Sequence, residues 1–472
     1  MNQSIVRLFV LVAVLFGLLV AWTSRWTVFE AEALRDNALN RRELLEEQRI
    51  RRGPIRARDG SLLARAVPSG AGTFTRRYPT GDLFAHAVGY SFLTIGRFGL
   101  EQSRNDPLTG RTTGVTSVID QLSGKEPEGE EVRTTLDPRA QRTAIRALGG
   151  RRGAVVAIEP ATGKVRVMAS VPAFDPNELR DARSLDALSN GSALNRTTLG
   201  QYPPGSTFKV VTAVAAIDSG RYTKDSQVSG RSPKTISGAP LQNSGGKDFG
   251  TIPLTTALTN SVNTVWAEVG ETLGGETMQR YMERFGFDST PTLDYPATQM
   301  TPSGEYYRGH LIAPASRFVD VGRMGIGQDK LSVTPLQMAE VAAAVANGGT
   351  LMRPHLTDRI VDPDGRTVQR IQPEVLSQVM RPSTAQAVNG MMQAVVTSGT
   401  GTPAQIPGMK VAGKTGTAET QLGTTINNVW FIAFAPADHP RVAVAVTVAG
   451  VPGFGAQFAA PIAKQVMEAL LK

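Results

Sequence analysis

Ser206 and Lys209 lie three residues apart at the predicted start of a helix, so both side chains share one helical face. Two prolines and a glycine precede Ser206, where the first N–H groups of a helix have no intrahelical partner. The following helix, from Val210 to Gly220, is apolar nearly all round, and we expect it to be buried. A serine beside a lysine at the mouth of a buried helix has the form of a nucleophile and its base. The alternative is that Ser206 only caps the helix.

Two other short motifs carry side chains that suit the same chemistry. Ser261-Val262-Asn263 lies between two apolar helical stretches, in a loop that could lean into a cleft. Lys414-Thr415-Gly416-Thr417 lies inside a predicted strand, where glycine lets a ligand or another backbone come close. We exclude the second copies of two patterns, because Ser244-Gly245-Gly246-Lys247 is a glycine loop that cannot hold a fixed pair and Ser103/Asn105 lies in an accessory module.

The composition excludes several other kinds of chemistry. The chain has no cysteine, which rules out thiolate catalysis, and its four histidines are scattered without ligand spacing. We therefore expect no metal site, no cofactor and no Ser-His-Asp triad. The net charge is +9, but the sequence has no nucleic-acid-binding signature, so we expect no nucleic-acid partner. A chain of 472 residues is too long for one ordinary core, and two or three domains are expected.

Residues 5–23 form an apolar stretch that is interrupted only by Arg7. As a helix this stretch would extend roughly 28 Å, close to the hydrocarbon thickness of about 30 Å. We interpret it as an uncleaved membrane anchor that follows a cytoplasmic tail of residues 1–4. The alternative is a cleaved signal peptide, but no small-residue cleavage site follows the apolar run. The distribution of arginines does not by itself place the N-terminus inside the cell.

The elements that must position the three motifs can be predicted from periodicity and turn signals. Residues 24–148 are interpreted as a stalk and a β-rich pedestal, with a charged helix over 27–52 and a strand pair around Asp59-Gly60. Residues 149–472 are interpreted as one α+β domain, in which strands from both ends of the segment form one antiparallel sheet flanked by helices, with a helical subdomain beside it. The expected elements are a hairpin over 154–169 at the centre of the sheet, a helix over 336–346, strands over 409–420, 429–435 and 442–448, and a closing helix over 459–471.

In order and spacing, the three motifs resemble those of the penicillin-recognising serine enzymes. Further segments along nearly the whole chain are similar to class B penicillin-binding proteins, and the short pedestal most resembles the penicillin-binding protein A type of actinobacteria. These segments are Arg52-Gly53-Pro54-Ile55, Asp59-Gly60, Gly99-Leu100-Glu101, Thr134-Thr135-Leu136-Asp137, Leu194-Asn195-Arg196, Gly327-Gln328, Thr334-Pro335 and Trp430-Phe431-Ile432-Ala433-Phe434-Ala435-Pro436. One departure is Asn428-Val429-Trp430, because many relatives carry a histidine before this tryptophan.

The resemblance implies a catalytic group of Ser206, Lys209 and Ser261. Lys209 would accept the proton of Ser206 if its amine is neutral, and burial with the nearby charge of Lys414 would lower its pKa. Ser261 would relay that proton to the leaving amine. The backbone N–H groups of Ser206 and Thr417 would form the oxyanion hole, in which one donor contributes about 2.7–4 kcal/mol.

The resemblance also implies a group of substrate-binding residues. Asn263 can donate to and accept from the peptide amide of the substrate. Lys414 would supply a fixed positive charge for a terminal carboxylate, and the hydroxyls of Thr415 and Thr417 can bind that carboxylate. Gly416 would keep this strand open to close approach.

The implied function is D,D-transpeptidation of peptidoglycan stem peptides ending in D-Ala-D-Ala, with β-lactams acylating Ser206 as substrate mimics. The family also implies a single-pass protein of the cytoplasmic membrane, with an extracytoplasmic catalytic domain and a SEDS-type glycan polymerase as partner. One alternative is a hydrolase on the same fold, either a D,D-carboxypeptidase or a β-lactamase, although no Glu-x-x-Leu-Asn-like element lies between residues 263 and 414. A second alternative is a non-catalytic scaffold or β-lactam sensor.

Overall fold

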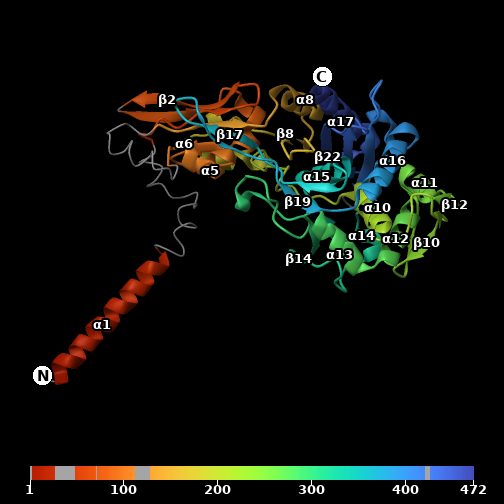
Figure 1. Cartoon of the computed structure of the whole chain (residues 1–472), viewed down its shortest axis with the longest axis horizontal. Coiled ribbons are helices and arrows are strands. Elements are labelled where there is room, and N and C mark those ends of the chain that lie inside the picture. Colours follow the sequence, from red (N-terminus) through yellow and green to blue (C-terminus); the bar gives the residue numbers. More distant parts are fainter. Residues whose placement is uncertain (1–2, 27–47, 71, 112–127, 420–425) are drawn as a thin grey trace.

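The computed structural model describes residues 3–26, 48–70, 72–111, 128–419 and 426–472 (Figure 1). The predicted charged helix falls largely on residues 27–47, which lie outside the described residues. The elements of the first third are α1 (Gln3–Ser24), β1 (Ile55–Arg56), β2 (Leu62–Gly70), β3 (Thr73–Arg77), η2 (Gly81–Phe84), α4 (Ala85–Val88), β4 (Tyr90–Phe92), β5 (Gly96–Phe98), α5 (Leu100–Ser103), α6 (Asn105–Leu108), β6 (Glu131–Thr134) and α8 (Pro138–Leu148).

A five-stranded antiparallel sheet in the order β20-β21-β22-β7-β8 joins the two ends of the C-terminal segment. This arrangement confirms the predicted α+β class and the single sheet made from both ends. The registers place Lys414 of β20 opposite Ile432 of β21, and Ala443 of β22 opposite Ile158 of β7. The strands are β7 (Gly153–Ile158), β8 (Val165–Val171), β20 (Ala412–Glu419), β21 (Ile426–Ala435) and β22 (Val442–Pro452).

The prediction that the hairpin β7–β8 lies at the centre of this sheet is wrong. The central strand is β22, and β8 is an edge strand. Its apolar sequence reflects cover from other elements rather than a second neighbouring strand. The Gln141 side chain donates to Met168 O and accepts from Met168 N, both at 3.0 Å, and thereby occupies the exposed backbone groups of the edge.

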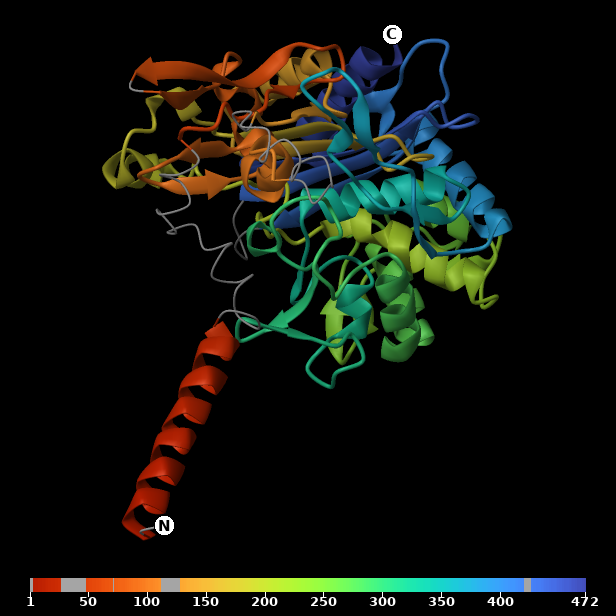
Figure 2. The same ribbon diagram turned by 60° about the vertical axis from the view of Figure 1, so that its left-hand side comes forward.

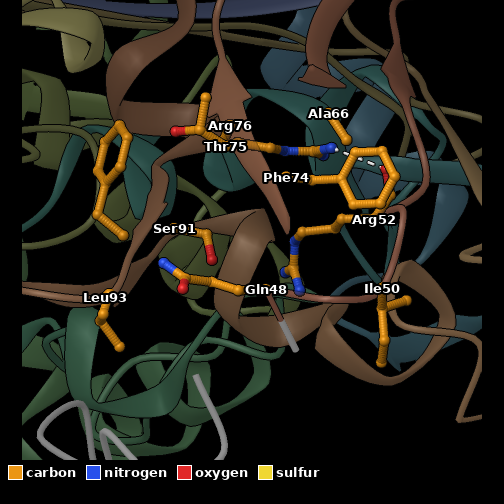
Figure 3. Close-up of a pocket in the computed structure, with 10 residues that line it drawn as sticks. Gln48, Ile50, Arg52, Ala66, Phe74, Thr75, Arg76, Ser91 and Leu93 are labelled. Atoms are coloured by element: carbon orange, nitrogen blue, oxygen red, sulfur yellow. Dashed lines mark hydrogen bonds between the residues drawn. The ribbon is translucent and has the colours of Figure 1, made fainter. Parts of the chain in front are cut away.

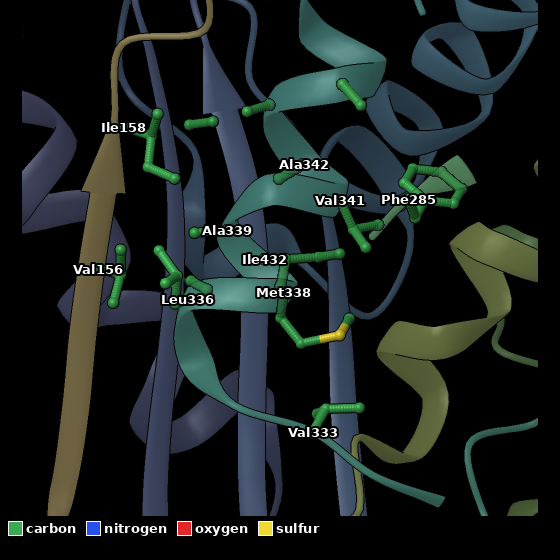
Figure 4. Close-up of a cluster of buried hydrophobic side chains, with 14 of the residues drawn as sticks. Val156, Ile158, Phe285, Val333, Leu336, Met338, Ala339, Val341, Ala342 and Ile432 are labelled. Carbon is green, nitrogen blue, oxygen red and sulfur yellow. The ribbon is translucent and has the colours of Figure 1, made fainter. Parts of the chain in front are cut away.

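Helices cover both faces of the sheet. The closing helix α17 (Gly455–Leu471) starts four residues earlier than predicted and packs with α8 on one face. The opposite face is covered by α15 (Pro335–Ala346), which begins after Thr334 as predicted. Figure 4 shows α15, which carries Leu336 and Met338, beside the strands that carry Val156, Ile158 and Ile432. The apolar side chains of these layers fix where β20, and hence the Lys414 motif, lies in the core.

A group of short helices and strands lies beside the sheet and corresponds to the predicted helical subdomain (Figure 2). In both views these helices lie at the opposite end of the molecule from β2 and β3. The remaining elements are η3 (Pro176–Glu178), α9 (Ala182–Asp186), η4 (Ala187–Asn190), η5 (Gly205–Phe208), α10 (Lys209–Asp218), β9 (Gln227–Ser229), β10 (Lys234–Ile236), β11 (Ala239–Leu241), η6 (Ser244–Gly246), β12 (Thr251–Pro253), α11 (Leu254–Thr259), α12 (Asn263–Leu273), α13 (Gly275–Arg284), η7 (Ala297–Gln299), β13 (Gly304–Tyr307), β14 (His310–Ile312), α14 (Val321–Met324), β15 (Leu331–Ser332), β16 (Thr350–Met352), β17 (Thr357–Val361), β18 (Thr367–Arg370), β19 (Val375–Gln378), α16 (Pro382–Ser398) and η8 (Thr402–Ala404).

The pedestal is built on a six-stranded sheet in the order β18-β17-β6-β1-β2-β3. The predicted strand pair around Asp59-Gly60 is present as β1 and β2, and Gly60 has the positive φ of +85° that its turn requires. Strands β17 and β18 come from the C-terminal segment, so this sheet crosses the boundary expected at residue 148. At the N-terminus, Ile5–Ser24 has a mean hydropathy of 2.7 and is long enough to cross a membrane.

Candidate active site

Ser206 lies in a tight 3-10 turn, η5, directly before the buried helix α10. The buried helix is as predicted, although it becomes α-helical only at Lys209 and ends at Asp218 rather than at Gly220. Gly205 has a φ of +52°, and a Cβ at this position would lie 2.5 Å from Thr417 O. Glycine is therefore required for the turn to approach strand β20 so closely.

Three contacts hold the Ser206 turn against its neighbours. Gly205 N donates to Gly327 O at 3.0 Å. Tyr202 pairs with Val333 through two backbone hydrogen bonds of 3.0 and 2.9 Å. The indole Nε1 of Trp430 donates to Pro203 O at 3.0 Å. The nucleophile candidate is thus fixed by backbone contacts on both sides rather than by its own side chain.

Lys209 points from the first turn of α10 toward the second motif. Its Nζ donates to Ser261 O at 2.8 Å and to Asn263 Oδ1 at 2.7 Å, and it lies 3.3 Å from Ser261 Oγ. Ser206 is half-buried, and its Oγ has no hydrogen-bond partner among the described residues. The direct Ser206–Lys209 bond that their spacing allows is therefore not formed in this state.

Lys414 reaches the same serine from the sheet. Its Nζ lies 2.9 Å from Ser261 Oγ and 2.9 Å from Thr415 O. Ser261 follows α11 with a φ of +57°, in the predicted loop between two helices. Its hydroxyl therefore lies between two amines, at 3.3 Å from Lys209 and 2.9 Å from Lys414.

The two lysines are both completely buried, and burial disfavours their charged forms. Burial lowers the pKa of Lys209 well below its ordinary value, and the positive charge of Lys414 lowers it further. Burial also lowers the pKa of Lys414, to about 7. Two ammonium groups on one hydroxyl repel each other, so the pair holds one proton fewer than two free lysines near neutral pH. Both causes act on Lys209, which favours its amine as the neutral one of the pair.

The rest of the Lys414 motif lines strand β20, as predicted. Thr415 Oγ1 lies 2.6 Å from Thr400 Oγ1. A Cβ on Gly416 would lie 2.6 Å from Pro204 O, so this glycine permits the close approach that its position in a strand predicted. Thr417 Oγ1 accepts a 3.4 Å hydrogen bond from Gly455 N.

Asn263 is the first residue of α12 and joins the Lys209 amine to a neighbouring loop. Its Nδ2 donates to Gln242 O at 3.2 Å, while its Oδ1 accepts from Lys209. The adjacent Asn243 is buried, and its Oδ1 accepts from Thr264 N at 3.0 Å, which satisfies a free donor at the start of α12.

The structure thus brings together all eight residues that the sequence predicted for the site: Ser206, Lys209, Ser261, Asn263, Lys414, Thr415, Gly416 and Thr417. Sequence reasoning missed Thr400 and Asn243. Thr400 lies in a Gly-Thr-Gly turn, and nothing in the local sequence indicates that it contacts Thr415. Asn243 directly precedes Ser244–Lys247, the excluded second Ser-x-x-Lys motif. A polar residue at the start of that glycine loop is the sequence feature that could have pointed to Asn243.

Comparisons with known proteins agree with this geometry. Residues 153–468 match the family model of the penicillin-binding protein transpeptidase domain, and residues 52–132 match that of the penicillin-binding protein A dimerisation domain. The protein named peptidoglycan D,D-transpeptidase PbpA of Mycolicibacterium smegmatis is 36% identical, over 100% of this chain and 99% of the relative. The protein of the same name from Mycobacterium tuberculosis is 34% identical over the same shares.

Solved structures give the same relationship. The ceftriaxone acyl-enzyme complex of penicillin-binding protein A from M. tuberculosis has a TM-score of 0.81 at 33% identity, over 91% of this chain and 100% of that one. Its imipenem acyl-enzyme complex has a TM-score of 0.80 at 34% identity, over the same shares. The resemblance inferred from the sequence motifs is confirmed, and the chain belongs to the penicillin-binding protein transpeptidase family, within its penicillin-binding protein A type.

Proposed function

We propose that this protein is a peptidoglycan D,D-transpeptidase that works through an acyl-enzyme on Ser206. The observation that carries the proposal is the Ser261 hydroxyl held between the buried amines of Lys209 and Lys414, next to the Ser206 turn. Family membership supports it, as do the D,D-transpeptidase names of its relatives and the β-lactam acyl-enzymes solved for one of them.

In the first step, Ser206 Oγ attacks the carbonyl carbon of the penultimate D-Ala, and its proton moves to the neutral Nζ of Lys209. The lowered pKa of Lys209 keeps this amine free to accept the proton. Apo geometry does not argue against the transfer, because catalytic hydrogen bonds often tighten only when substrate binds.

In the second step, the tetrahedral intermediate collapses and the C–N bond to the terminal D-Ala breaks. The leaving nitrogen takes a proton from Ser261 Oγ, which regains one from Lys209, 3.3 Å away. An acceptor amine from a neighbouring stem peptide then attacks the ester, loses its proton along the same path and releases Ser206. The net result is one new peptide cross-link and one free D-Ala.

The substrate-binding roles follow from the same positions. In its charged form Lys414 attracts the terminal carboxylate, with the hydroxyls of Thr415 and Thr417 as donors on the same strand. Asn263 offers an amide to the peptide backbone of the substrate. The backbone N–H groups of Ser206 and Thr417 form the oxyanion hole, a role that is supported by the closeness of Gly205 to Thr417.

We also propose the arrangement of the whole chain. Residues 1–4 form a cytoplasmic tail, 5–23 an uncleaved membrane anchor, 24–148 a stalk and pedestal, and 149–472 the transpeptidase domain outside the cytoplasmic membrane. The length and hydropathy of Ile5–Ser24 support the anchor. A SEDS-type glycan polymerase is the proposed membrane partner, bound through the anchor and pedestal.

The test is a reaction of the full-length protein with a synthetic stem pentapeptide ending in D-Ala-D-Ala and a stem peptide with a free acceptor amine. Mass spectrometry should find the cross-linked dimer and one equivalent of D-Ala, and Ser206→Ala should yield neither. Release of D-Ala with only the hydrolysed tetrapeptide would assign a D,D-carboxypeptidase instead. A protein that is inactive in this reaction but still binds β-lactams would indicate a non-catalytic β-lactam sensor.

A further inference from the structure

A small pocket opens in the pedestal, and none of its lining residues belongs to the three motifs of the active site (Figure 3). Its volume is about 70 Å³. Five of its ten lining residues are apolar, namely Ile50, Ala66, Phe74, Phe92 and Leu93. A cavity of this size is several times larger than the space that one water molecule needs, so it can admit one side chain.

The polar floor of the pocket belongs to a buried ionic network. Arg52 Nε donates to Glu101 Oε2 at 2.7 Å, and Arg76 Nε donates to Glu101 Oε1 at 2.6 Å. The Glu101 side chain is 0% exposed and that of Arg76 is 2% exposed. One buried carboxylate is therefore shared by two guanidinium groups.

Arg76 retains a donor that this network does not use. Its Nη1 donates to Arg52 O at 3.2 Å, but its Nη2 is buried and has no hydrogen-bond partner among the described residues. Both oxygens of Glu101 already accept from arginine. A buried charged donor without an acceptor is costly, and native proteins leave few such groups unmatched. Arg76 is one of the residues that line the pocket, so its unmatched donor lies directly beneath the pocket floor.

We propose that this pocket binds the carboxylate of an acidic side chain presented by an apolar segment of a partner protein. The carboxylate accepts from Arg76 Nη2 as a charge-assisted hydrogen bond. Ser91 and Gln48 carry further polar groups along the same pocket (Figure 3). The flanking apolar side chains of the segment pack on Phe74 and Phe92.

The walls of the pocket select this ligand over other anions. A phospholipid headgroup or a sugar phosphate would place polar groups against the apolar part of the walls. Inorganic phosphate would fit, but it would leave the walls formed by Ile50, Phe74 and Leu93 exposed to water. An acidic residue with apolar neighbours satisfies both the buried donor and the apolar walls.

The experiment uses the full-length protein in detergent micelles and two peptides that differ only in charge, acetyl-Leu-Glu-Leu-amide and acetyl-Leu-Gln-Leu-amide. Isothermal titration calorimetry should show the glutamate peptide binding at least about tenfold more tightly than the glutamine peptide, because hydrogen bonds to charged groups contribute about 1.5–3 kcal/mol. Inorganic phosphate should bind more weakly than the glutamate peptide.

Three variants define the site. Arg76→Met should abolish the preference for the glutamate peptide, whereas Arg77→Met, at the exposed neighbouring position on the same strand, should retain it. Ala66→Leu fills the pocket without changing the ionic network and should weaken both peptides. Acylation by penicillin G should be unchanged in all three, which checks folding and separates this proposal from the proposed catalytic function.

Equal affinity for the two peptides would overturn the proposal, as would a preference for glutamate that survives in Arg76→Met. Phosphate binding as tightly as the glutamate peptide would assign a general anion site and overturn it as well. If Arg76→Met fails to fold, the Ala66→Leu variant provides the test. Peptide binding to Ala66→Leu that is as tight as to the wild type would exclude this pocket as the binding site.

Discussion

At the residue scale, two buried lysines meet on the hydroxyl of Ser261. A buried ammonium is costly, and two of them so close together cost more, so the arrangement stores one amine in its neutral form. Serine needs such a base because its hydroxyl is a weak nucleophile at neutral pH. Strand β20 contributes Lys414, whose ammonium form places a positive charge beside the site. Lys209 remains free to accept a proton.

The pH dependence of acylation by penicillin G should be bell-shaped. The second-order rate constant should rise as Lys209 loses its proton at a pH far below 10.5, and fall as Lys414 loses its proton near pH 7. Lys414→Arg should move the falling limb upward by at least about one pH unit, because arginine does not deprotonate in this range. Stopped-flow acylation from pH 5 to 10 measures both limbs. An unchanged falling limb in Lys414→Arg would contradict the assignment.

Thr400 should act on substrate binding through Thr415, whose hydroxyl lies 2.6 Å from its own. Thr400→Val leaves the Thr415 hydroxyl without this partner, and the acylation rate constant should fall up to about tenfold, because one neutral hydrogen bond contributes about 0.5–1.5 kcal/mol. Thr397→Val is the matched control, since Thr397 is exposed and its hydroxyl donates to Gln393 O, away from the site. Equal effects of the two variants would remove Thr400 from the site.

At the scale of elements, the site is made by the meeting of a helix start, an interhelical loop and a strand. The sequence predicted each of these, because prolines, glycines and apolar runs mark them locally. Sequence spacing could not predict that these elements meet at Ser261, because Lys209 and Lys414 are far apart in the sequence and only the tertiary fold brings them together. The family resemblance implied this arrangement. The hairpin β7–β8 was misplaced for a related reason: both faces of edge strand β8 pack into hydrophobic clusters, which gives it the apolar sequence of a central strand.

Gly327 should be needed for the position of the Ser206 turn. A Cβ there would lie 2.0 Å from Gly205 O, and the residue has a φ of +76°. Gly327→Ala should therefore displace the turn and lower acylation by about 100-fold, the effect expected of a displacement of about 1 Å. Gly348→Ala provides the control, with a φ of +62° but open space around its Cβ. If both variants acylated at the wild-type rate, the proposed constraint on the turn would be wrong.

At the scale of the whole molecule, the pedestal and the catalytic segment are joined by shared structure. Strands β17 and β18 extend the pedestal sheet, and Arg104 of the pedestal pairs with Asp294 of the catalytic segment at 2.6 Å. The pedestal also carries its own buried ionic network around Glu101.

Glu101 should be a main electrostatic determinant of pedestal stability. Burial alone would raise its pKa, but Arg76 and Arg52 hold the pKa below its usual value of 4.5. Its contribution is therefore present above pH 4.5 and is lost as the pH falls through the lowered pKa. Glu101→Gln should cost about 3–5 kcal/mol of unfolding free energy at pH 7. Glu131→Gln, which affects more exposed pairs with Arg56 and Arg133, should cost about 0–1 kcal/mol in the same denaturant titration.

The most direct test of the account is intact-protein mass spectrometry after brief exposure to penicillin G, followed by peptide mapping. We predict one penicilloyl group per chain, located on Ser206, that persists for far longer than the reaction takes to form it. Lys209→Met should slow its formation by about 100- to 10,000-fold, as expected for loss of the catalytic base. An adduct on another side chain, or none on correctly folded protein, would contradict the assignment of Ser206 as the nucleophile.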